Sequence, residues 1–252
     1  MKYLILTLLI SCNLAAQVDF KYGATARSYP SLGGDAFIDT GYNQILWGDN
    51  GQSPLYGLIR PSVTGSSSVV VSTYDAKLTV YPISFIGLGA GHKEVTSEYD
   101  EFTYFDCTDV ACEGKMFKDY SFGKLALAYG PFLSTFSYSE FRNTYHDDYN
   151  TGSSVAEYEY ILATQLNNEK QIQRTYFLGY KLGDDLIGLV SDQVQFLESN
   201  KDYQLHLAIY QKRIENFKMT FGIGSLHSSD QKPGLNLILR MEHILLPSLA
   251  LF

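Results

Sequence analysis

The sequence has 252 residues, of which 45% are apolar, 18% are charged and 14% are aromatic. The formal net charge of -8 argues against a general nucleic-acid binder, because affinity for phosphate backbones requires a basic excess. Beyond the N-terminal segment no apolar run reaches the roughly 18 residues of a membrane-spanning helix, so a helical membrane protein is excluded. No linker divides the chain, and its length suits one large all-β domain.

Residues 1–16 have the features of an export signal. Lys2 supplies a positive charge, an apolar core follows, and Ala16 is a small residue at the expected cleavage position before Gln17, so the segment resembles a secretory signal peptide. Cys12 allows an alternative, because residues 9–12 resemble a lipobox in which this cysteine would be lipidated. We favour ordinary cleavage, since a barrel of the kind derived below needs no lipid anchor. Both alternatives take the protein out of the cytoplasm.

The two other cysteines, Cys107 and Cys112, lie in a polar, acidic segment. In an oxidising compartment such a pair is expected to form a disulfide. Metal binding is the alternative, but the segment contains no histidine and two thiolates alone make a poor zinc site. The pair therefore predicts a disulfide.

From residue 18 onward apolar and polar side chains mostly alternate, which is typical of strands with one apolar face. Gly87, Gly89 and Gly91 lack the dinucleotide-binding spacing, and no helix is predicted after them, so a nucleotide loop is rejected. Alternate glycines are instead expected to leave room for neighbouring side chains inside a barrel. The predicted strands cover residues 18–27, 36–47, 55–64, 69–81, 85–99, 117–129, 132–145, 171–182, 186–197, 203–212, 217–227 and 235–252.

The segment 146–170 is ambiguous. Tyr158 and Tyr160 alternate with Glu157 and Glu159 as in a strand, yet residues 154–157 also form a capping box that could begin a helix. Both alternatives remain open. Because bacterial barrels have an even number of strands, we treat this segment as one outer loop, which leaves about twelve strands. It then lies on the same side as the long acidic segment 100–115, and the short turns lie on the periplasmic side.

The last stretch, 235–252, is apolar to the final residue, Phe252. Soluble domains seldom end in this way, because termini usually fray into water. The stretch resembles the closing strand of Gram-negative outer-membrane β-barrels, which ends in an aromatic residue that is recognised during assembly. The resemblance implies a closed antiparallel transmembrane β-barrel over residues 17–252 in the bacterial outer membrane. It also implies outer-membrane lipid and the barrel-assembly machinery as partners.

A soluble, secreted, lipocalin-like barrel that binds a small ligand is the alternative fold, since its strands also have period two. The membrane barrel is favoured because the strands have the length of a tilted span and aromatic rings gather at their ends, as at Trp47, Tyr81 and Tyr129.

In a membrane barrel the polar faces line the lumen. The predicted lumenal acids are Asp19, Asp39, Asp75 and Glu242. The predicted lumenal bases, which would set selectivity, are Lys21, Arg27, Arg60, Lys77, Lys124, Lys181, Lys212, Lys218 and Arg240. The basic excess predicts a narrow pore for small polar or anionic solutes. Alternatively, these charges pair across strands and plug the barrel, which would leave a structural or interaction role.

An outer-membrane lipid esterase is a further alternative, because some twelve-stranded barrels that resemble this chain are lipid hydrolases with a Ser-His pair. The candidates are His227 and Ser229, which lie in turn-like sequence at a strand end, so the interpretation without catalysis is favoured and the question of an enzyme stays open. His206 is predicted to face the lumen without a partner. Metal-ligand spacing is also absent from the other histidines, His92, His146 and His243. No metal and no other cofactor is therefore expected.

In the closing strand, the apolar row changes from odd to even positions. Leu235 to Met241 form an outward row on odd positions, whereas Phe252 has the opposite parity, together with Leu246. Both rows can face lipid only if the strand register slips by one residue between them. Pro247 predicts a β-bulge at this point, because proline cannot donate to the sheet.

Overall fold

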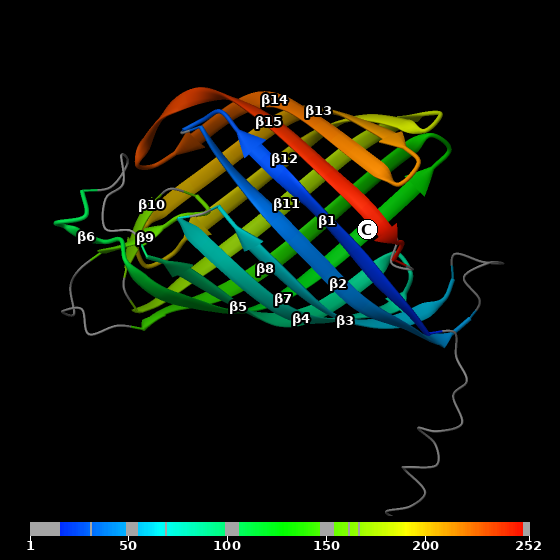
Figure 1. The fold of residues 1–252 in the computed structure, drawn as a ribbon, viewed down its shortest axis with the longest axis horizontal. Helices are drawn as coiled ribbons and strands as arrows, with labels where there is room; N and C mark the ends of the chain where they lie inside the picture. Colours follow the sequence, from blue (N-terminus) through cyan, green and yellow to red (C-terminus); the bar gives the residue numbers. More distant parts are fainter. Residues whose placement is uncertain are drawn as a thin grey trace, which may run out of the picture.

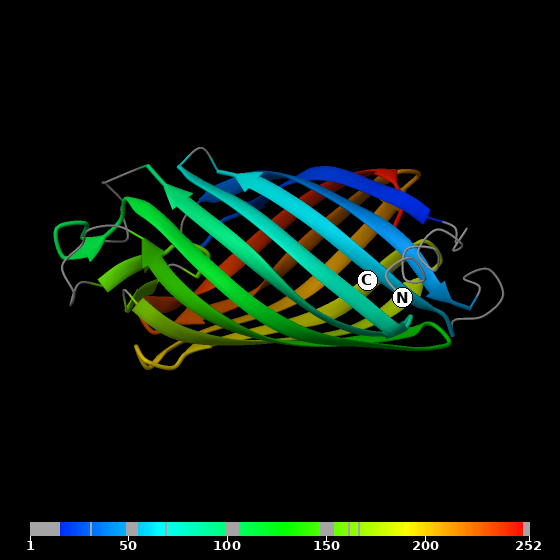
Figure 2. The ribbon, with the colours of Figure 1, turned by 90° about the horizontal axis from the view of Figure 1, so that it is seen from below.

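The computed structural model describes residues 16–30, 32–48, 55–68, 70–98, 106–146, 154–160, 162–165 and 167–248. Twelve strands form a closed antiparallel barrel in the order β1-β15-β14-β13-β12-β11-β8-β7-β5-β4-β3-β2 (Figures 1 and 2). This confirms the predicted fold class. A three-stranded sheet, in the order β10-β9-β6, lies at one end of the barrel. Within the described ranges, no helix is long and apolar enough to cross a membrane.

The strands of the small sheet are β6 (Val110–Ala111), β9 (Ser154–Glu157) and β10 (Leu162–Gln165). The strands of the barrel are β1 (Ala16–Arg27), β2 (Gly33–Trp47), β3 (Gly57–Ser67), β4 (Val71–Ile83), β5 (Ile86–Ser97), β7 (Gly114–Tyr129), β8 (Phe132–His146), β11 (Asn167–Leu182), β12 (Asp185–Phe196), β13 (Lys201–Ile214), β14 (Phe217–Ser228) and β15 (Gln231–Leu246).

The two ends of the barrel differ in their connections. Tight turns join β4 to β5, β7 to β8, β11 to β12 and β13 to β14 at one end, which we call the short-turn end. The glycines Gly130 and Gly183 supply the positive φ angles of 57° and 63° that two of these turns require. The connections that carry β6, β9 and β10 lie at the opposite, long-loop end. The described parts of the two predicted outer segments, residues 106–115, 154–160 and 162–165, therefore lie at the same end.

Side chains alternate between the two faces of the barrel wall. In β2, Phe37, Asp39 and Asn43 are buried toward the interior, whereas Ile38 and Tyr42 between them are exposed. An apolar surface exposed over so many strands is far larger than the patches of soluble monomers and suits contact with lipid. Exposed outward side chains include Tyr74, Leu78, Leu88, Leu127, Leu178, Leu189, Phe221, Ile223, Leu237 and Met241.

The alternate glycines of β5 point into the barrel, where large rings lie against them. A Cβ atom on Gly89 would lie 2.5 Å from the ring of Phe122, and one on Gly91 would lie 2.5 Å from the ring of Tyr120. Both rings come from β7, the strand that pairs with β5. The expectation that these glycines leave room for side chains inside the barrel is confirmed.

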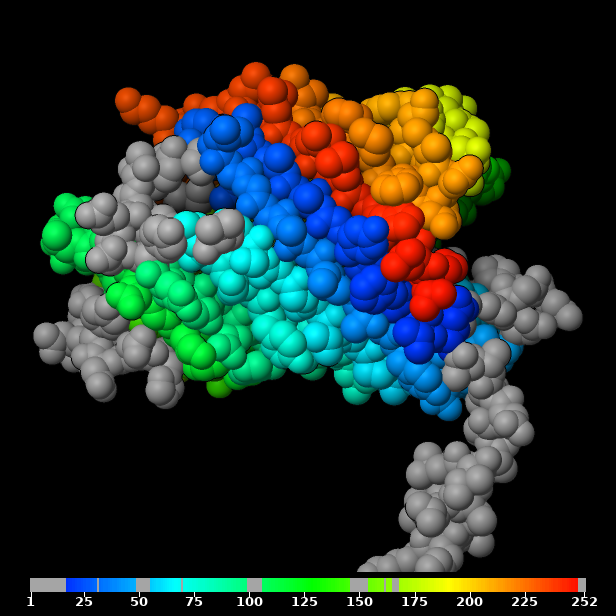
Figure 3. All heavy atoms as spheres, in the orientation of Figure 1, coloured from blue at the N-terminus to red at the C-terminus, as the bar shows by residue number. Residues whose placement is uncertain are grey.

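The barrel closes where β1 meets β15, which lie side by side in Figure 3. In this pairing Lys21 lies opposite Ile244, but Phe20 lies opposite Leu246, so the ladder skips Leu245. The predicted register slip therefore exists, two residues before Pro247. It turns Leu246 outward together with Phe20, and Leu246 is 48% exposed. Phe252 lies outside the described residues.

The direction of β13 corrects the prediction from its sequence. Tyr203, Leu205 and Leu207 face the interior and are buried, whereas His206 and Lys212 lie on the exposed outward face. Neither of these two basic side chains therefore lines the lumen. The reason is that the interior beside β13 is itself apolar, so hydrophobicity alone does not mark the lipid side of this strand.

Candidate functional site: the barrel interior and its closure

Ion pairs cross three adjacent strands at the short-turn half of the barrel. The guanidinium of Arg60 on β3 lies 2.6 Å from Asp19 on β1 and 2.8 Å from Asp39 on β2. Thr64 donates a hydrogen bond of 2.6 Å to Asp39, and the amide of Asn43 donates to Asp19. These inward side chains satisfy one another, as buried charges must.

A second group of charges lines β14 and β15. Glu242 accepts an ion pair from Lys218 and another from Arg240, the latter at 2.9 Å. The Arg240 guanidinium also lies 4.4 Å from the ring centre of Phe37. The side chains of Arg240 and Lys218 remain 42% and 29% exposed although they point inward. This part of the interior is therefore accessible to water.

Two lysines of this interior form no close ion pair. Lys21 on β1 and Lys124 on β7 form no ion pair within 4.0 Å among the described residues. The Lys124 ammonium group lies 5.1 Å from the ring centre of Phe122. It is also close enough to Lys21 and Lys77 for their positive charges to repel one another. Lys77 pairs weakly with Asp75 at 3.8 Å, and that carboxylate also accepts a 2.6 Å hydrogen bond from Tyr120. We call Lys21, Lys77 and Lys124 the basic face.

A β-hairpin from the β8–β11 connection closes the long-loop end. It consists of β9, a turn at residues 158–160, and β10. Lys118 on β7 lies 2.7 Å from Glu157 and 2.8 Å from Glu159, and Lys93 on β5 also pairs with Glu159. The side chains of Lys118 and Glu157 are 0% and 1% exposed. The hairpin is therefore fixed to the barrel wall by an ion network in which the Lys118–Glu157 pair is fully buried and Glu159 stays partly exposed.

The pKa values of the hairpin tip follow from this packing. Burial opposes ionisation of Glu159, but the ammonium groups of Lys118 and Lys93 outweigh it and hold the pKa of this carboxyl well below its usual range. Burial raises the pKa of the neighbouring Tyr160 well above its ordinary value. The tip therefore carries an ionised carboxylate and a neutral phenol at physiological pH.

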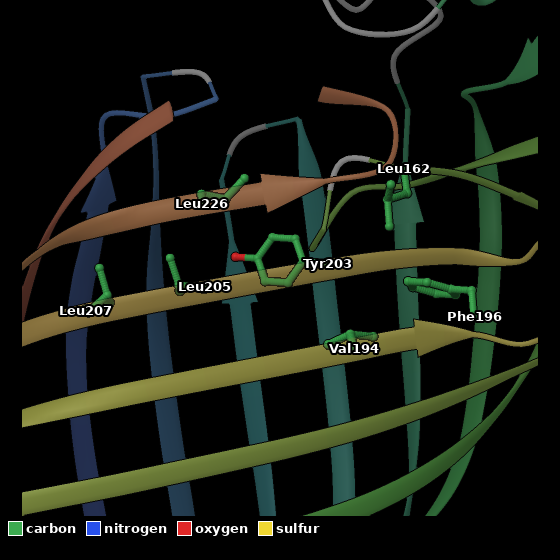
Figure 4. Close-up of a cluster of buried hydrophobic side chains, with 7 residues drawn as sticks. All are labelled: Leu162, Val194, Phe196, Tyr203, Leu205, Leu207 and Leu226. Atoms are coloured by element: carbon green, nitrogen blue, oxygen red, sulfur yellow. The ribbon is translucent and has the colours of Figure 1, made fainter. Parts of the chain in front are cut away.

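The other side of the hairpin packs on an apolar part of the interior. The Tyr160 ring centre lies 5.9 Å from that of Phe196 and 5.0 Å from that of Tyr203. Leu162 joins a buried cluster whose other members come from β12, β13 and β14 (Figure 4). The cluster contains Leu162, Val194, Phe196, Tyr203, Leu205, Leu207 and Leu226, with Val190, Ile209 and Ile238 packed at its edge.

These contacts place the hairpin across the bore. Its tip contacts β5 and β7 through Glu159, and β12 and β13 through Tyr160. Arg27 at the end of β1 donates a hydrogen bond of 3.3 Å to the Glu159 carbonyl. Because β1, β7 and β13 lie on different sides of the ring of strands, a segment that touches all three spans the opening.

The predicted disulfide belongs to the same closure. Cys107 and Cys112 are bonded, and β6, which lies between them, pairs in parallel with β9. The Tyr158 hydroxyl donates to the Cys112 carbonyl, and Val155 packs in a buried cluster with Val95 and Met116. The disulfide loop therefore supports the hairpin from outside.

The structure brings most of the predicted lumenal bases to the inward faces of their strands. This holds for Lys21, Arg27, Arg60, Lys77, Lys124, Lys181, Lys218 and Arg240, and not for Lys212. Their role in selectivity stays a prediction. Sequence reasoning missed Lys93 and Lys118, although Lys93 continues the parity of Gly89 and Gly91, and Lys118 that of Lys124. It also missed that Glu157 and Glu159 fold back onto them.

The esterase candidates are not assembled as a catalytic pair. The Ser229 hydroxyl donates a 2.7 Å hydrogen bond to the Asp202 carboxylate, and in the described part of the chain it makes none with His227. No group of three or more His, Cys, Asp or Glu side chains among the described residues could hold a metal ion.

Comparison with known proteins identifies a class of fold. No protein-family model matches the chain, and no curated protein matches it in sequence. An outer membrane channel from Pseudomonas putida F1 matches with a TM-score of 0.51 at 10% identity, over 93% of this chain and 97% of that chain. A KdgM porin matches at 0.49 and 8% identity, over 89% and 98%. A loop-deletion mutant of OmpT from Vibrio cholerae matches at 0.46 and 9% identity, over 91% and 99%. The chain therefore has the fold of outer-membrane β-barrels.

Proposed function

We propose that this protein is a narrow outer-membrane pore that prefers small anionic solutes and is constricted at its long-loop end by the β9–β10 hairpin. The observation that carries the proposal is the basic face. Lys21 and Lys124 lie inside the barrel without a paired carboxylate in the described residues, so they attract anions from water. The exposed apolar outer wall supports a location in lipid.

The membrane context extends this proposal to localisation and assembly. Residues 1–15 of the expected export signal and the C-terminal Phe252 lie outside the described residues, so the signal and the role of Phe252 remain sequence-based expectations. We expect residence in a bacterial outer membrane, contact with its lipid, and recognition of the last strand by the barrel-assembly machinery. The two-phase β15, whose bulge turns Leu246 outward, supports an outward C-terminal strand.

A plugged structural or interaction barrel is the second candidate. The full burial of Lys118, Leu162 and Phe196 at the long-loop end favours it, because packing of this quality leaves little room for a solute. In this alternative the basic face is reached from the short-turn end only. The two candidates differ in whether ions cross the barrel.

Single-channel recording in planar bilayers tests the pore. We expect discrete conductance steps, with a reversal potential in a potassium chloride gradient that shows anion preference. Lys124→Gln should reduce that preference, because it removes an unpaired cation from the interior. Lys212→Gln is the matched control, since this lysine faces outward and its loss should leave selectivity unchanged. Absence of steps, or cation preference, would contradict the proposal and favour the plugged barrel.

A further inference from the structure

The interior has two chemically different walls. We call the inward side chains Leu205, Leu207, Ile209, Leu226 and Ile238 the apolar face. They come from β13, β14 and β15, whereas the basic face comes from β1, β4 and β7. In the ring of strands, β13 lies opposite β4, and β15 lies opposite β7. Lys77 and Lys124 therefore lie across the bore from the apolar face, whereas Lys21 lies on β1, the strand beside β15.

The apolar face extends beyond what the hairpin covers. Tyr160 and Leu162 pack on its part nearest the long-loop end, beside Tyr203. Farther from that end, Ile209 and Ile238 are only partly buried at the edge of the cluster. Gly222 lies between them in the β14 ladder and adds no side chain of its own to this part of the wall. Aliphatic surface facing water inside a pore is unfavourable unless a ligand covers it.

The inward acid on the strand beside β13 is hydrogen-bonded within its own part of the wall. Asp192 on β12 accepts a 2.7 Å hydrogen bond from Thr175 and 3.0 Å and 3.2 Å bonds from Gln173, both on β11. An anion bound against Ile209 and Ile238 would face Lys77 and Lys124 across the bore, and Arg240 lies two residues from Ile238 on the same face of β15.

We infer that the interior binds amphiphilic organic anions, which carry one acidic group and an apolar body, in preference to equally charged polar anions such as sugar acids. The inference rests on the proposed function for the solute charge and goes beyond it in naming the body of the solute. The acidic group lies at the basic face, and the apolar body covers Ile209 and Ile238 below the hairpin.

Two probes of equal charge separate the two parts of the inference. Benzenesulfonate has an apolar body, and glucuronate has a polar one. Binding is measured by saturation-transfer NMR with the full protein in nanodiscs, and protein-free nanodiscs correct for partition into lipid. We expect benzenesulfonate to bind about tenfold or more tightly than glucuronate, since transfer of a ring from water to an apolar wall is favourable. Relative permeability from reversal potentials is recorded in parallel.

Variants on opposite faces of one strand provide the control. Ile209→Thr keeps the branched shape and should weaken benzenesulfonate binding about threefold to tenfold while leaving glucuronate unchanged. Ala208→Thr, on the outward face, should change neither. Lys124→Gln should weaken both probes. Equal binding of the two probes, or an equal effect of Ile209→Thr on both, overturns the inference while the pore stands. Selective binding without conductance supports this site and refutes the pore.

Discussion

The long-loop end of this barrel and the β14–β15 wall of its short-turn half use the same kinds of charged side chains in different ways. At the long-loop end the fully buried pair of Lys118 and Glu157, together with the partly exposed Glu159, fixes the hairpin across the bore. At the short-turn half Arg240 and Lys218 stay partly hydrated, and Lys21 forms no ion pair in the described residues. Buried charges lock a segment, whereas hydrated charges act on solutes. Closure and selectivity are therefore separable by mutation.

Removal of the buried ammonium group of Lys118 should have the largest effect on the difference between the two ends of the barrel. Lys118→Met leaves Glu157 without its ion-pair partner and deprives Glu159 of one of two, which should weaken hairpin docking by about 3–5 kcal/mol. We expect larger single-channel conductance and faster proteolysis within residues 154–165.

Lys115→Met is the control for that variant. Lys115 lies on the same strand and pairs with Glu94 at 2.9 Å, but its side chain is 54% exposed, so its loss should cost well under about 1 kcal/mol. Wild-type conductance and protease resistance in Lys118→Met would show that the ion network does not hold the hairpin.

Loss of the bridging guanidinium should affect stability at the other end. Arg60→Gln leaves Asp19 and Asp39 without their shared cation, and we expect the free energy of unfolding to fall by about 3 kcal/mol. The midpoint of heat-modifiable gel migration measures this change. Arg213→Gln, which removes an exposed arginine near the short-turn end, should leave the midpoint unchanged. If Arg60→Gln instead releases the hairpin, the two ends are coupled and not separable.

Opening the disulfide should loosen the hairpin less than Lys118→Met does. The bridge closes a short loop with a sequence separation of 5, so its removal should cost about 2 kcal/mol or less. We expect more current fluctuation in wild type after addition of a reductant, measured as open-channel noise. The double variant Cys107→Ser/Cys112→Ser should show this noise at the start and ignore the reductant. A reductant effect that persists in the double variant would assign the noise to another cause.

Mild acidification should have the smallest effect on hairpin docking. Because the pKa of Glu159 is lowered in the folded protein, its contribution to docking is complete above the ordinary pKa of a glutamate. The contribution is lost only as the pH falls through the lowered value. Conductance and protease resistance of the hairpin should therefore be equal at about pH 7.5 and pH 5.5. Release of the hairpin within this window would mean that Glu159 is protonated there and that the ion pairs are weaker than described.

The sequence predicted the fold well because barrel strands repeat one local rule. Alternation identified the barrel strands, and the parity of Phe252 against Leu235 predicted a register slip that the structure places at Leu245. The pair Cys107 and Cys112 was predictable because expected export to an oxidising compartment, with Cys12 removed, leaves these two cysteines to pair with each other.

The interior was less predictable, because alternation distinguishes two faces without stating which one is inside. Leu205 and Leu207 look like lipid-facing residues, and only their packing against Leu226 and Leu162 makes them interior. The hairpin was unpredictable for another reason. Glu157 and Glu159 read as solvated loop charges until a distant lysine, Lys118, is brought beside them by the closed topology.

The skipped residue at the seam affects the whole ring. In a closed sheet the residue offsets between successive strand pairs must add up on returning to the first strand, and their sum determines the strand tilt and the bore width. Leu245 changes this sum at the joint between the first strand to be synthesised and the last. Deletion of this single residue would therefore either change the width of the bore or exchange the inward and outward faces at the C-terminal end of β15. The calibre of the barrel thus depends in part on a residue that contributes no group to its interior chemistry.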